Sequence, residues 1–308
     1  MSYSLPKIPI LMFHSVLDLH GGDAKQRSTN PAYSLSVKQF REQMEYLHNN
    51  GYKTLHLDQV LSLPSPFKKE DVIPAKAGIQ KDTGFRIKCG MTDRLGESSF
   101  HLNGNTQIPN KSLVITFDDG WADNYTNVFP ILKEYGLIAT IFVITGFIGQ
   151  ANYMDWNQLR EMSEAGISIQ SHTVNHKPLA QMSKAEVEYE LVTSKNTIEN
   201  ALGKQVNFLS LPHGVFNDQV LKMTWEAGYH AVCTSNPGFS HEYKHLPVMK
   251  RINISDQLPI DAFNKILEKN ETIILPMLFS KKMKNLARRA IGHDSYRKLY
   301  ELRYRVKT

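Results

Sequence analysis

Strand-like and helix-like segments alternate along most of this chain, and this order limits the folds that the chain can adopt. Sustained β-α alternation predicts parallel strands that are joined by crossover helices. Seven or eight such units suit a distorted (β/α) barrel of the α/β class better than an open sheet. The expected strands are residues 7–16, 53–57, 112–120, 138–146, 167–172, 207–214, 229–235 and 247–255.

Polar residues close several of these predicted strands. His14, Asp118, Asp119 and His172 lie at strand ends, and so does the turn Pro212-His213-Gly214. In barrels of parallel strands, the active site lies at the C-terminal ends of the strands. We therefore expect these side chains to meet on one rim of the barrel.

The pentapeptide TFDDG places Asp118 beside Asp119 directly after an apolar run. Two adjacent carboxylates repel each other, and one resists ionisation unless a cation or a hydrogen-bond donor is near. The alternative is an ordinary polar turn, since Asp before Gly is common in turns. Convergence with the other strand ends favours a cation at this rim.

The hexapeptide SHTVNH supplies the expected partner for the carboxylates. His172 and His176 are four residues apart, so on a helical turn they would face the same way. Two imidazoles and one carboxylate form the ligand set of a catalytic zinc ion or another divalent metal. A surface helix is the alternative for the histidine pair alone.

Composition excludes several classes of protein. The chain has 308 residues, of which 41% are hydrophobic and 21% charged, as in globular proteins. Cys89 and Cys233 are the two cysteines, which argues against a disulfide framework. The amino-terminal sequence lacks the features of a secretory signal, so we expect a cytoplasmic protein.

Positive charge is concentrated at the C-terminus. Residues 281–308 hold ten Lys or Arg and two acids, whereas the other 280 residues hold 26 basic and 28 acidic groups. The nearly neutral body argues against a nucleic-acid surface. We expect residues 271–308 to form a basic helical tail, which either packs on the barrel or contacts an anionic membrane at its inner face.

Together, TFDDG and SHTVNH resemble the motifs of the polysaccharide deacetylase family, carbohydrate esterase family 4. The segments IPILMFHSV and NPAYSLSVKQFREQMEYLHNNGYKTLHLDQVL extend the resemblance, which runs from about residue 8 to about residue 265. The resemblance implies a barrel that removes N-acetyl groups from amino-sugar glycans with a bound divalent metal, most simply Zn²⁺. We expect residues 1–65 and 108–270 to form this barrel.

Carried over residue by residue, the resemblance assigns roles. Asp118 matches the catalytic base, and Asp119, His172 and His176 match the metal ligands. A base of this kind would take a proton from the attacking water, and a general acid would protonate the leaving amine.

The sequence departs from the commoner family pattern at two motifs. Ser210-Leu211-Pro212-His213 stands where many relatives have Arg-x-Pro-aromatic, and no Leu-x-His motif follows near the C-terminus. The chain resembles a circularly permuted subgroup, in which the last strand comes first. His14 would then be the general acid, or else a core histidine, and Arg251 could replace the missing Arg or be a surface or ion-pair residue. Expected sugar contacts are Pro212, His213, Arg251 and Trp156, although His213 could simply complete a turn.

Residues 66–107 interrupt the pattern without sustained periodicity. They resemble the translated product of an intergenic repeat, inserted in frame. Because loop-closure entropy rises slowly with length, a surface insertion is tolerated, and we expect a disordered excursion without a catalytic role.

Three functions remain open at this stage. The complete set of base and ligands favours a metal-dependent sugar N-deacetylase. A catalytically silent glycan- or metal-binding relative is the alternative, because of the missing Arg and the insertion. A hydrolase of another acyl or amide substrate is the third, since a fold does not determine a function.

Overall fold

The computed structural model describes residues 7–18, 31–61, 108–239, 242–243 and 246–291. The predicted insertion, residues 66–107, falls entirely outside these ranges, and so does the tail after residue 291. The predicted disorder of the insertion therefore stays a prediction.

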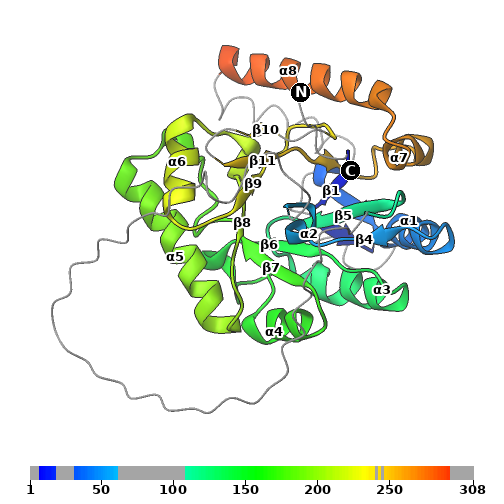
Figure 1. Ribbon diagram of the computed structural model, residues 1–308, viewed down its shortest axis with the longest axis horizontal. Helices are drawn as coiled ribbons and strands as arrows, with labels where there is room; N and C mark the ends of the chain where they lie inside the picture. The colour runs from blue at the N-terminus through cyan, green and yellow to red at the C-terminus, as the bar shows by residue number, and fades with distance from the viewer. Residues whose placement is uncertain (1–6, 19–30, 62–107, 240–241, 244–245, 292–308) are drawn as a thin grey trace.

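Six parallel strands form the body of the sheet (Figure 1). Their order across the sheet is β9-β8-β7-β6-β5-β1, and the register is parallel at every step. The strands are β1 (Ile10–Phe13), β5 (Ser112–Phe117), β6 (Thr140–Val143), β7 (Ser168–Ser171), β8 (Phe208–Ser210) and β9 (Ala231–Cys233). All six residues of β5 are buried, which is typical of a strand that is covered on both faces.

One short segment closes the barrel. β11 (Pro247–Met249) pairs with β9, and β12 (Ile252–Asn253) pairs with β1, both in parallel. The single strand predicted at 247–255 was therefore wrong in detail, because the segment changes partner at Lys250-Arg251. The predicted distorted (β/α) barrel is confirmed, with this split strand at its seam.

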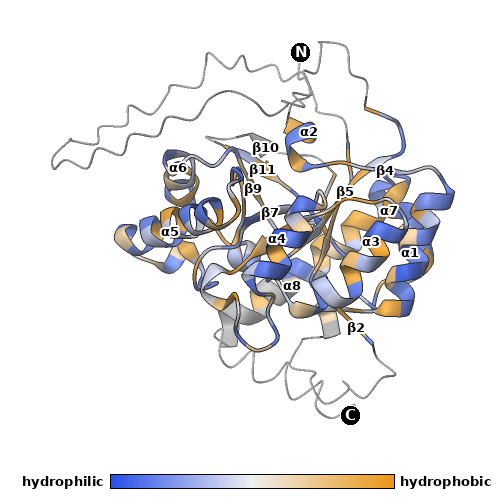
Figure 2. Ribbon diagram, turned by 90° about the horizontal axis from the view of Figure 1, so that it is seen from below, coloured by the Kyte–Doolittle hydropathy of each residue, from blue (hydrophilic) through white to orange (hydrophobic). Residues whose placement is uncertain are grey.

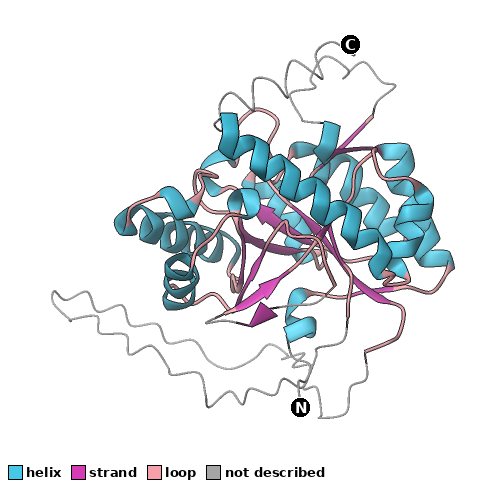
Figure 3. Cartoon of the chain, turned by 90° about the horizontal axis from the view of Figure 1, so that it is seen from above, coloured by secondary structure: helices cyan, strands magenta, loops and turns pink. Residues whose placement is uncertain are grey.

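Helices surround the strands (Figure 3). The larger ones are α1 (Val37–Asn49), α3 (Phe129–Glu134), α4 (Trp156–Glu164), α5 (Lys184–Leu202), α6 (Asp218–Glu226), α7 (Ile260–Leu267) and α8 (Ile274–Ile291). Shorter elements are β2 (Ser15–Leu17), β3 (Ser34–Ser36), β4 (Lys53–Thr54), α2 (Leu57–Leu61), β10 (Glu242–Tyr243) and the π-helix η4 (Asn124–Val128). Figure 2 shows the hydrophobic strands enclosed by helices whose outer sides carry many hydrophilic residues.

Local sequence signals explain where two of the helices begin. The Ser36 hydroxyl accepts a hydrogen bond from the Gln39 amide at the start of α1. Ser183 and Glu186 form a reciprocal capping box at the start of α5, as their spacing predicts. These caps satisfy amide groups that have no partner inside the helix.

A phenylalanine cluster joins α1 to the first strands. The ring of Phe13 lies 5.6 Å from Phe40 and 5.2 Å from Phe117, between ring centroids. Each of the three side chains is fully buried, which contributes about 1.5–3 kcal/mol per side chain. The cluster anchors β1 and β5 side by side, so that the residues after both strands emerge together.

No helix in the described ranges combines the length and the apolar character that crossing a bilayer requires. The location of the protein in the cell therefore stays a prediction from the sequence.

Candidate active site

One cavity of about 630 Å³ lies at the C-terminal ends of the strands. His14 follows β1, Asp118 and Asp119 follow β5, and His172 follows β7, and all four side chains line it. The structure thus brings together the polar strand ends that the sequence predicts on one rim.

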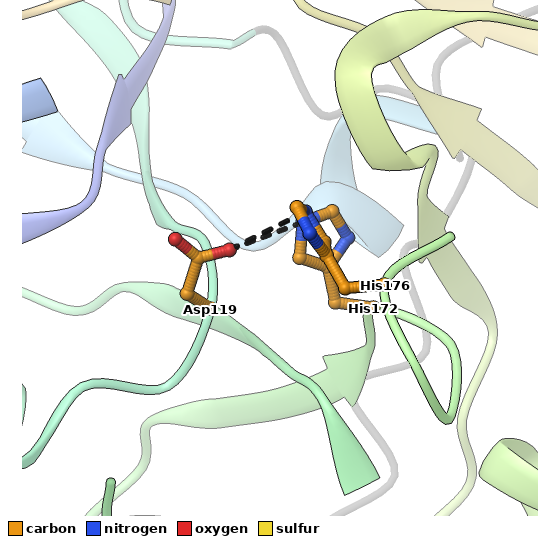
Figure 4. A group of neighbouring side chains, drawn as sticks. All are labelled: Asp119, His172 and His176. Atoms are coloured by element: carbon orange, nitrogen blue, oxygen red, sulfur yellow. Dashed lines mark ion pairs between the residues drawn. The ribbon is translucent and has the colours of Figure 1, made fainter. Parts of the chain in front are cut away.

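Asp119, His172 and His176 point toward a common centre (Figure 4). Oδ1 of Asp119 lies 3.5 Å from Nε2 of His172 and 3.6 Å from Nε2 of His176. The three ligand atoms all lie within 4.8 Å of one another. A carboxylate oxygen and two imidazole nitrogens with open positions match the donor set of a catalytic zinc site.

The surroundings of these atoms fit a bound cation. Oδ1 of Asp119 is buried without a hydrogen-bond partner among the described residues, and burial of an unpaired carboxylate oxygen is costly. Nδ1 of His172 lies 2.8 Å from the backbone oxygen of Ser210. That contact places the proton on Nδ1 and leaves Nε2 free to bind a metal.

Protonation of the two imidazoles differs. Burial and the neighbouring His172 lower the pKa of His176 to about 3, so its ring is neutral at pH 7. Burial also lowers the pKa of His172, but the carboxylates of Asp118 and Asp119 outweigh it, and the net shift is upward. A metal ion would compete with protons for Nε2 of His172, so metal binding should weaken as the pH falls.

The loop that carries both histidines is not helical, so the predicted helical turn at 172–176 was wrong. Thr173 and His176 have φ angles of 69° and 56°, in the left-handed region that excludes an α-helix. Buried Glu190 of α5 holds the loop instead: its carboxylate accepts hydrogen bonds from the amides of Val174 and Asn175, at 2.7 and 2.9 Å. The two imidazoles still face each other, with ring centroids 4.7 Å apart.

Asp118 and Arg251 form a bidentate ion pair next to the cluster of Asp119, His172 and His176. Nη1 of Arg251 lies 2.7 Å from Oδ1 of Asp118, and Nη2 lies 2.7 Å from Oδ2. Burial raises the pKa of Asp118. The charge and hydrogen bonds of Arg251 lower it by a larger amount, so the resulting pKa is about 2. Asp118 is therefore ionised and held in one orientation.

Arg251 is 1% exposed, so the surface alternative for this residue was wrong. Its Nε donates to the backbone oxygen of Thr234, and its guanidinium carbon lies 5.4 Å from the ring centroid of Phe142. Ser210 stands where the family resemblance calls for an Arg, and its hydroxyl contacts both Arg251 and Asp118, at 2.8 and 3.1 Å. Arg251, from the segment between β11 and β12, thus lies beside Asp118 where the small Ser210 leaves space.

His14 also lines this cavity. Its ring centroid is 4.6 Å from that of Tyr33, and its Nδ1 is buried without a partner among the described residues. Burial lowers the pKa of His14, although both carboxylates raise it. A general acid must carry a proton at the working pH, so this environment runs against the predicted acid role, which stays a prediction.

Three side chains after the TFDDG motif hold the backbone around His14. Asn124 donates to the backbone oxygen of His14 at 2.8 Å, and Asn127 donates to that of Val16 at 2.7 Å. Asp123 accepts from the Val16 amide at 2.9 Å and from the Ser15 hydroxyl. Asn124 and Asn127 belong to the π-helix η4, a form that occurs often at functional sites.

Trp121 lines the cavity and is a site residue that our sequence analysis missed. Its Nε1 donates to Oδ2 of Asp119 at 3.1 Å, and its ring stacks on Tyr153 with centroids 4.6 Å apart. Its place two residues after Asp119 is the sequence signal that could have revealed it.

The residues predicted to contact the sugar do not all line the cavity. His213 lines the cavity, with its ring centroid 4.8 Å from that of His176, whereas Pro212 is buried. Trp156 is half-buried against the hydrophobic core and is absent from the described residues that line the cavity. Trp121, rather than Trp156, lines the cavity.

Comparisons with known proteins agree with this geometry. Residues 105–232 match the family described as polysaccharide deacetylase. A Bacillus subtilis protein provisionally named polysaccharide deacetylase YxkH is 29% identical over 262 residues, which cover 85% of this chain and 76% of that protein. The poly-beta-1,6-N-acetyl-D-glucosamine N-deacetylase of Staphylococcus aureus is 30% identical over 183 residues, 53% of this chain and 60% of the enzyme.

A solved structure matches the fold over nearly its whole length. The Streptococcus pyogenes deacetylase PplD, in complex with acetate, superposes with a TM-score of 0.63 and 26% sequence identity. The match covers 85% of this chain and 98% of PplD. Fold and site together define the chain as a hydrolase of the deacetylase class. Residues 105–232 carry a polysaccharide deacetylase domain; the predicted circular permutation stays a prediction.

Proposed function

We propose that this protein is a metal-dependent hydrolase that removes N-acetyl groups from an amino-sugar-containing polysaccharide, oligosaccharide or glycan precursor. The observation that carries this proposal is the single cavity where three metal-ligand atoms face a carboxylate held by a buried Arg. The Staphylococcus aureus relative, named for acting on an N-acetylglucosamine polymer, supports the substrate class.

Asp118 is the proposed general base. A divalent ion on Asp119, His172 and His176 would polarise the acetyl carbonyl and make a nearby water more acidic. With a pKa of about 2, Asp118 is a weak base but a fully ionised one. It can accept the proton only of a water that has been made acidic, so base and metal depend on each other.

Arg251 is the proposed positioning residue for that base. Its planar guanidinium matches both carboxylate oxygens, so it prevents rotation of the Asp118 side chain. One oxygen of Asp118 also lies 3.9 Å from Nε2 of His172, which keeps the base beside the ligand set. His14, which lines the same cavity, is the proposed donor to the leaving amine.

Zn²⁺ is the proposed metal. The set of two imidazole nitrogens and one carboxylate oxygen is shared by zinc hydrolases and by non-haem iron sites, and hydrolysis requires no change of redox state. Metal content of the purified protein, with restoration of a chelated sample by Zn²⁺, Co²⁺ or Fe²⁺ in turn, distinguishes them.

Aromatic side chains favour a sugar as the substrate. Trp121 and Tyr33 both line the cavity beside the catalytic groups. Amphipathic rings of this kind present an apolar face to a ligand and a polar edge to water. We propose that these two residues contact the sugar ring that carries the acetyl group.

Acetate release from a panel of N-acetylated oligosaccharides, with and without a chelator, tests the proposed function. We expect release that stops with the chelator and returns with added metal. Metal binding without release from any member of the panel would favour the silent glycan-binding alternative. Release from acetylated esters or non-sugar amides alone would favour the third alternative, a different acyl hydrolase.

The structure removes one reason for the silent alternative. That alternative arose because the expected Arg is absent from the Ser210 motif, yet Arg251 occupies the place beside Asp118. In the described residues, the proposed base, the proposed positioning Arg and the three proposed ligands lie around one cavity, which supports the enzyme over the silent alternative.

A further inference from the structure

The inner side of α8 forms one wall of the active-site cavity. Pro276, Met277, Ser280 and Lys281 all line it. Nζ of Lys281 donates to the side-chain oxygen of Asn236 at 2.6 Å, which ties the helix to the loop after β9. The position of α8 relative to the catalytic groups is therefore set by contacts with the barrel.

The opposite side of α8 is exposed and apolar. Leu275, Phe279 and Leu286 are 69%, 67% and 59% exposed, and Leu278 is also exposed. Within the described part of the chain, ten large apolar side chains are exposed, and five of them lie between residues 275 and 286. We call one set of residues on this side the outer stripe. It consists of Leu275, Leu278, Phe279, Lys282 and Leu286.

The spacing of the outer stripe follows the turn of the helix. Its members, residues 275, 278, 279, 282 and 286, recur at intervals of three and four, so they share one face. Met277 and Lys281 fall on the opposite face and reach the cavity. The barrel covers only the inner face of α8. The apolar outer stripe is therefore left exposed unless another surface packs against it.

The positive charge in and after the outer stripe favours one kind of binding partner. Exposed Lys282 lies in the middle of the stripe, and residues 281–308 carry ten Lys or Arg against two acids. An apolar stripe mixed with basic residues fits the boundary between anionic headgroups and acyl chains, where a Lys stem stays in the apolar layer and its ammonium reaches the headgroups. A second copy of the chain is a poorer occupant, because a two-fold contact would bring two Lys282 side chains together.

We propose that the outer stripe of α8 docks on an anionic lipid surface. The helix is about 10 Å across, so docking holds the cavity about one helix diameter from the headgroups. This inference rests on the proposed deacetylase function. With the cavity so close to the headgroups, the favoured substrates are glycans that are still attached to the membrane or growing there.

Binding of the full chain to lipid vesicles tests the proposal. The vesicles contain phosphatidylcholine alone or phosphatidylcholine with phosphatidylglycerol, and sedimentation is measured at low and high salt without substrate. We expect binding to the anionic vesicles that falls with salt. The double variant Leu275→Ser/Phe279→Ser should weaken this binding by about tenfold or more, since it removes the two most exposed members of the stripe.

A matched control replaces exposed apolar residues elsewhere. Tyr189 and Val192 of α5 are also exposed, so Tyr189→Ser/Val192→Ser changes the same kind of surface and should leave vesicle binding unchanged. Melting temperature and acetate release from a short soluble oligosaccharide should stay the same in both double variants, because none of these residues lines the cavity. This second readout separates failure of docking from failure of the proposed function.

Three outcomes would overturn the proposal. They are equal loss of vesicle binding in the two double variants, equal binding to neutral and anionic vesicles, and no binding by the native protein. A dimer in solution that Leu275→Ser/Phe279→Ser dissociates, without vesicle binding, would instead assign the stripe to a second copy.

Discussion

Arg251 and Asp118 hold each other through two hydrogen bonds of 2.7 Å, although 133 residues separate them in the sequence. Both side chains are buried, so the ion pair has little contact with solvent. A buried charge that loses its partner is strongly destabilising, whereas a positioned pair is tolerated. The pair therefore links the stability of the barrel seam to the orientation of the proposed base.

Arg251→Lys should keep the charge but lose the two-pronged geometry. A lysine ammonium is a point charge and cannot match both carboxylate oxygens. We expect kcat/KM to fall by about 100-fold, with metal content unchanged. Steady-state kinetics and metal analysis check this, and Arg160→Lys, on the exposed side of α4, is the control. Equal kinetics for native protein and Arg251→Lys would show that bidentate positioning is unimportant.

Substitution of the two adjacent carboxylates should separate metal binding from turnover. Asp119→Asn should lose metal and activity together, as should His172→Ala, because a two-ligand site holds a divalent ion poorly. Asp118→Asn should retain metal and lose turnover by about 100-fold or more, since only the base is removed. The prediction fails if Asp118→Asn loses metal as readily as Asp119→Asn.

His14→Ala should discriminate between leaving groups if His14 protonates the departing amine. We expect hydrolysis of the N-acetyl amide to slow by about 100-fold or more. An activated acetyl ester, whose leaving group requires no proton, should be hydrolysed at nearly the native rate. Equal losses on amide and ester would make His14 a structural residue, in agreement with its lowered pKa.

Asn124→Ala should act through His14 rather than directly. The change removes the hydrogen bond to the His14 backbone oxygen and leaves that oxygen without this donor, so stability should fall by about 1–3 kcal/mol. Loss on the amide should exceed loss on the ester, as in His14→Ala but smaller. Asn50→Ala, which removes a hydrogen bond at the C-terminal end of α1, is the control. A stability loss without any change in the amide-to-ester ratio would contradict the positioning role.

The stability of the metal-free protein should depend on Asp118 in acid. Its folded pKa of about 2 lies below the ordinary 3.8, so the unfolded chain binds more protons between about pH 4 and pH 2. The contribution is therefore fully present above about pH 4 and is lost as the pH falls through 2, an effect of about 2 kcal/mol. Denaturant unfolding of native protein and Asp118→Asn across this range, in chelator, checks it. Parallel curves for the two proteins would show that the ion pair makes no such contribution.

Local patterns in the sequence were sufficient to predict most of the elements and the polar groups that meet at the site. Alternating apolar runs and amphipathic helices depend on residue spacing alone, and so do the caps at Ser36 and Ser183. The motif residues Asp118, Asp119 and His172 follow strand ends, and parallel strands bring such ends together whatever the details of packing. For this reason the expected rim and the three-ligand cluster were predicted and are present.

Contacts between distant segments required the tertiary structure. Arg251 reaches Asp118 because the closing segment changes from β9 to β1 at that residue, and no local pattern encodes a change of partner. The loop that carries His176 is held by Glu190 of α5 and has left-handed residues, so the helical turn considered from spacing alone does not form. Which side of α8 faces the cavity is likewise decided by what the barrel presents to it. The sequence specifies which groups are available, and packing decides which of them meet, because burial and pairing depend on neighbours far along the chain.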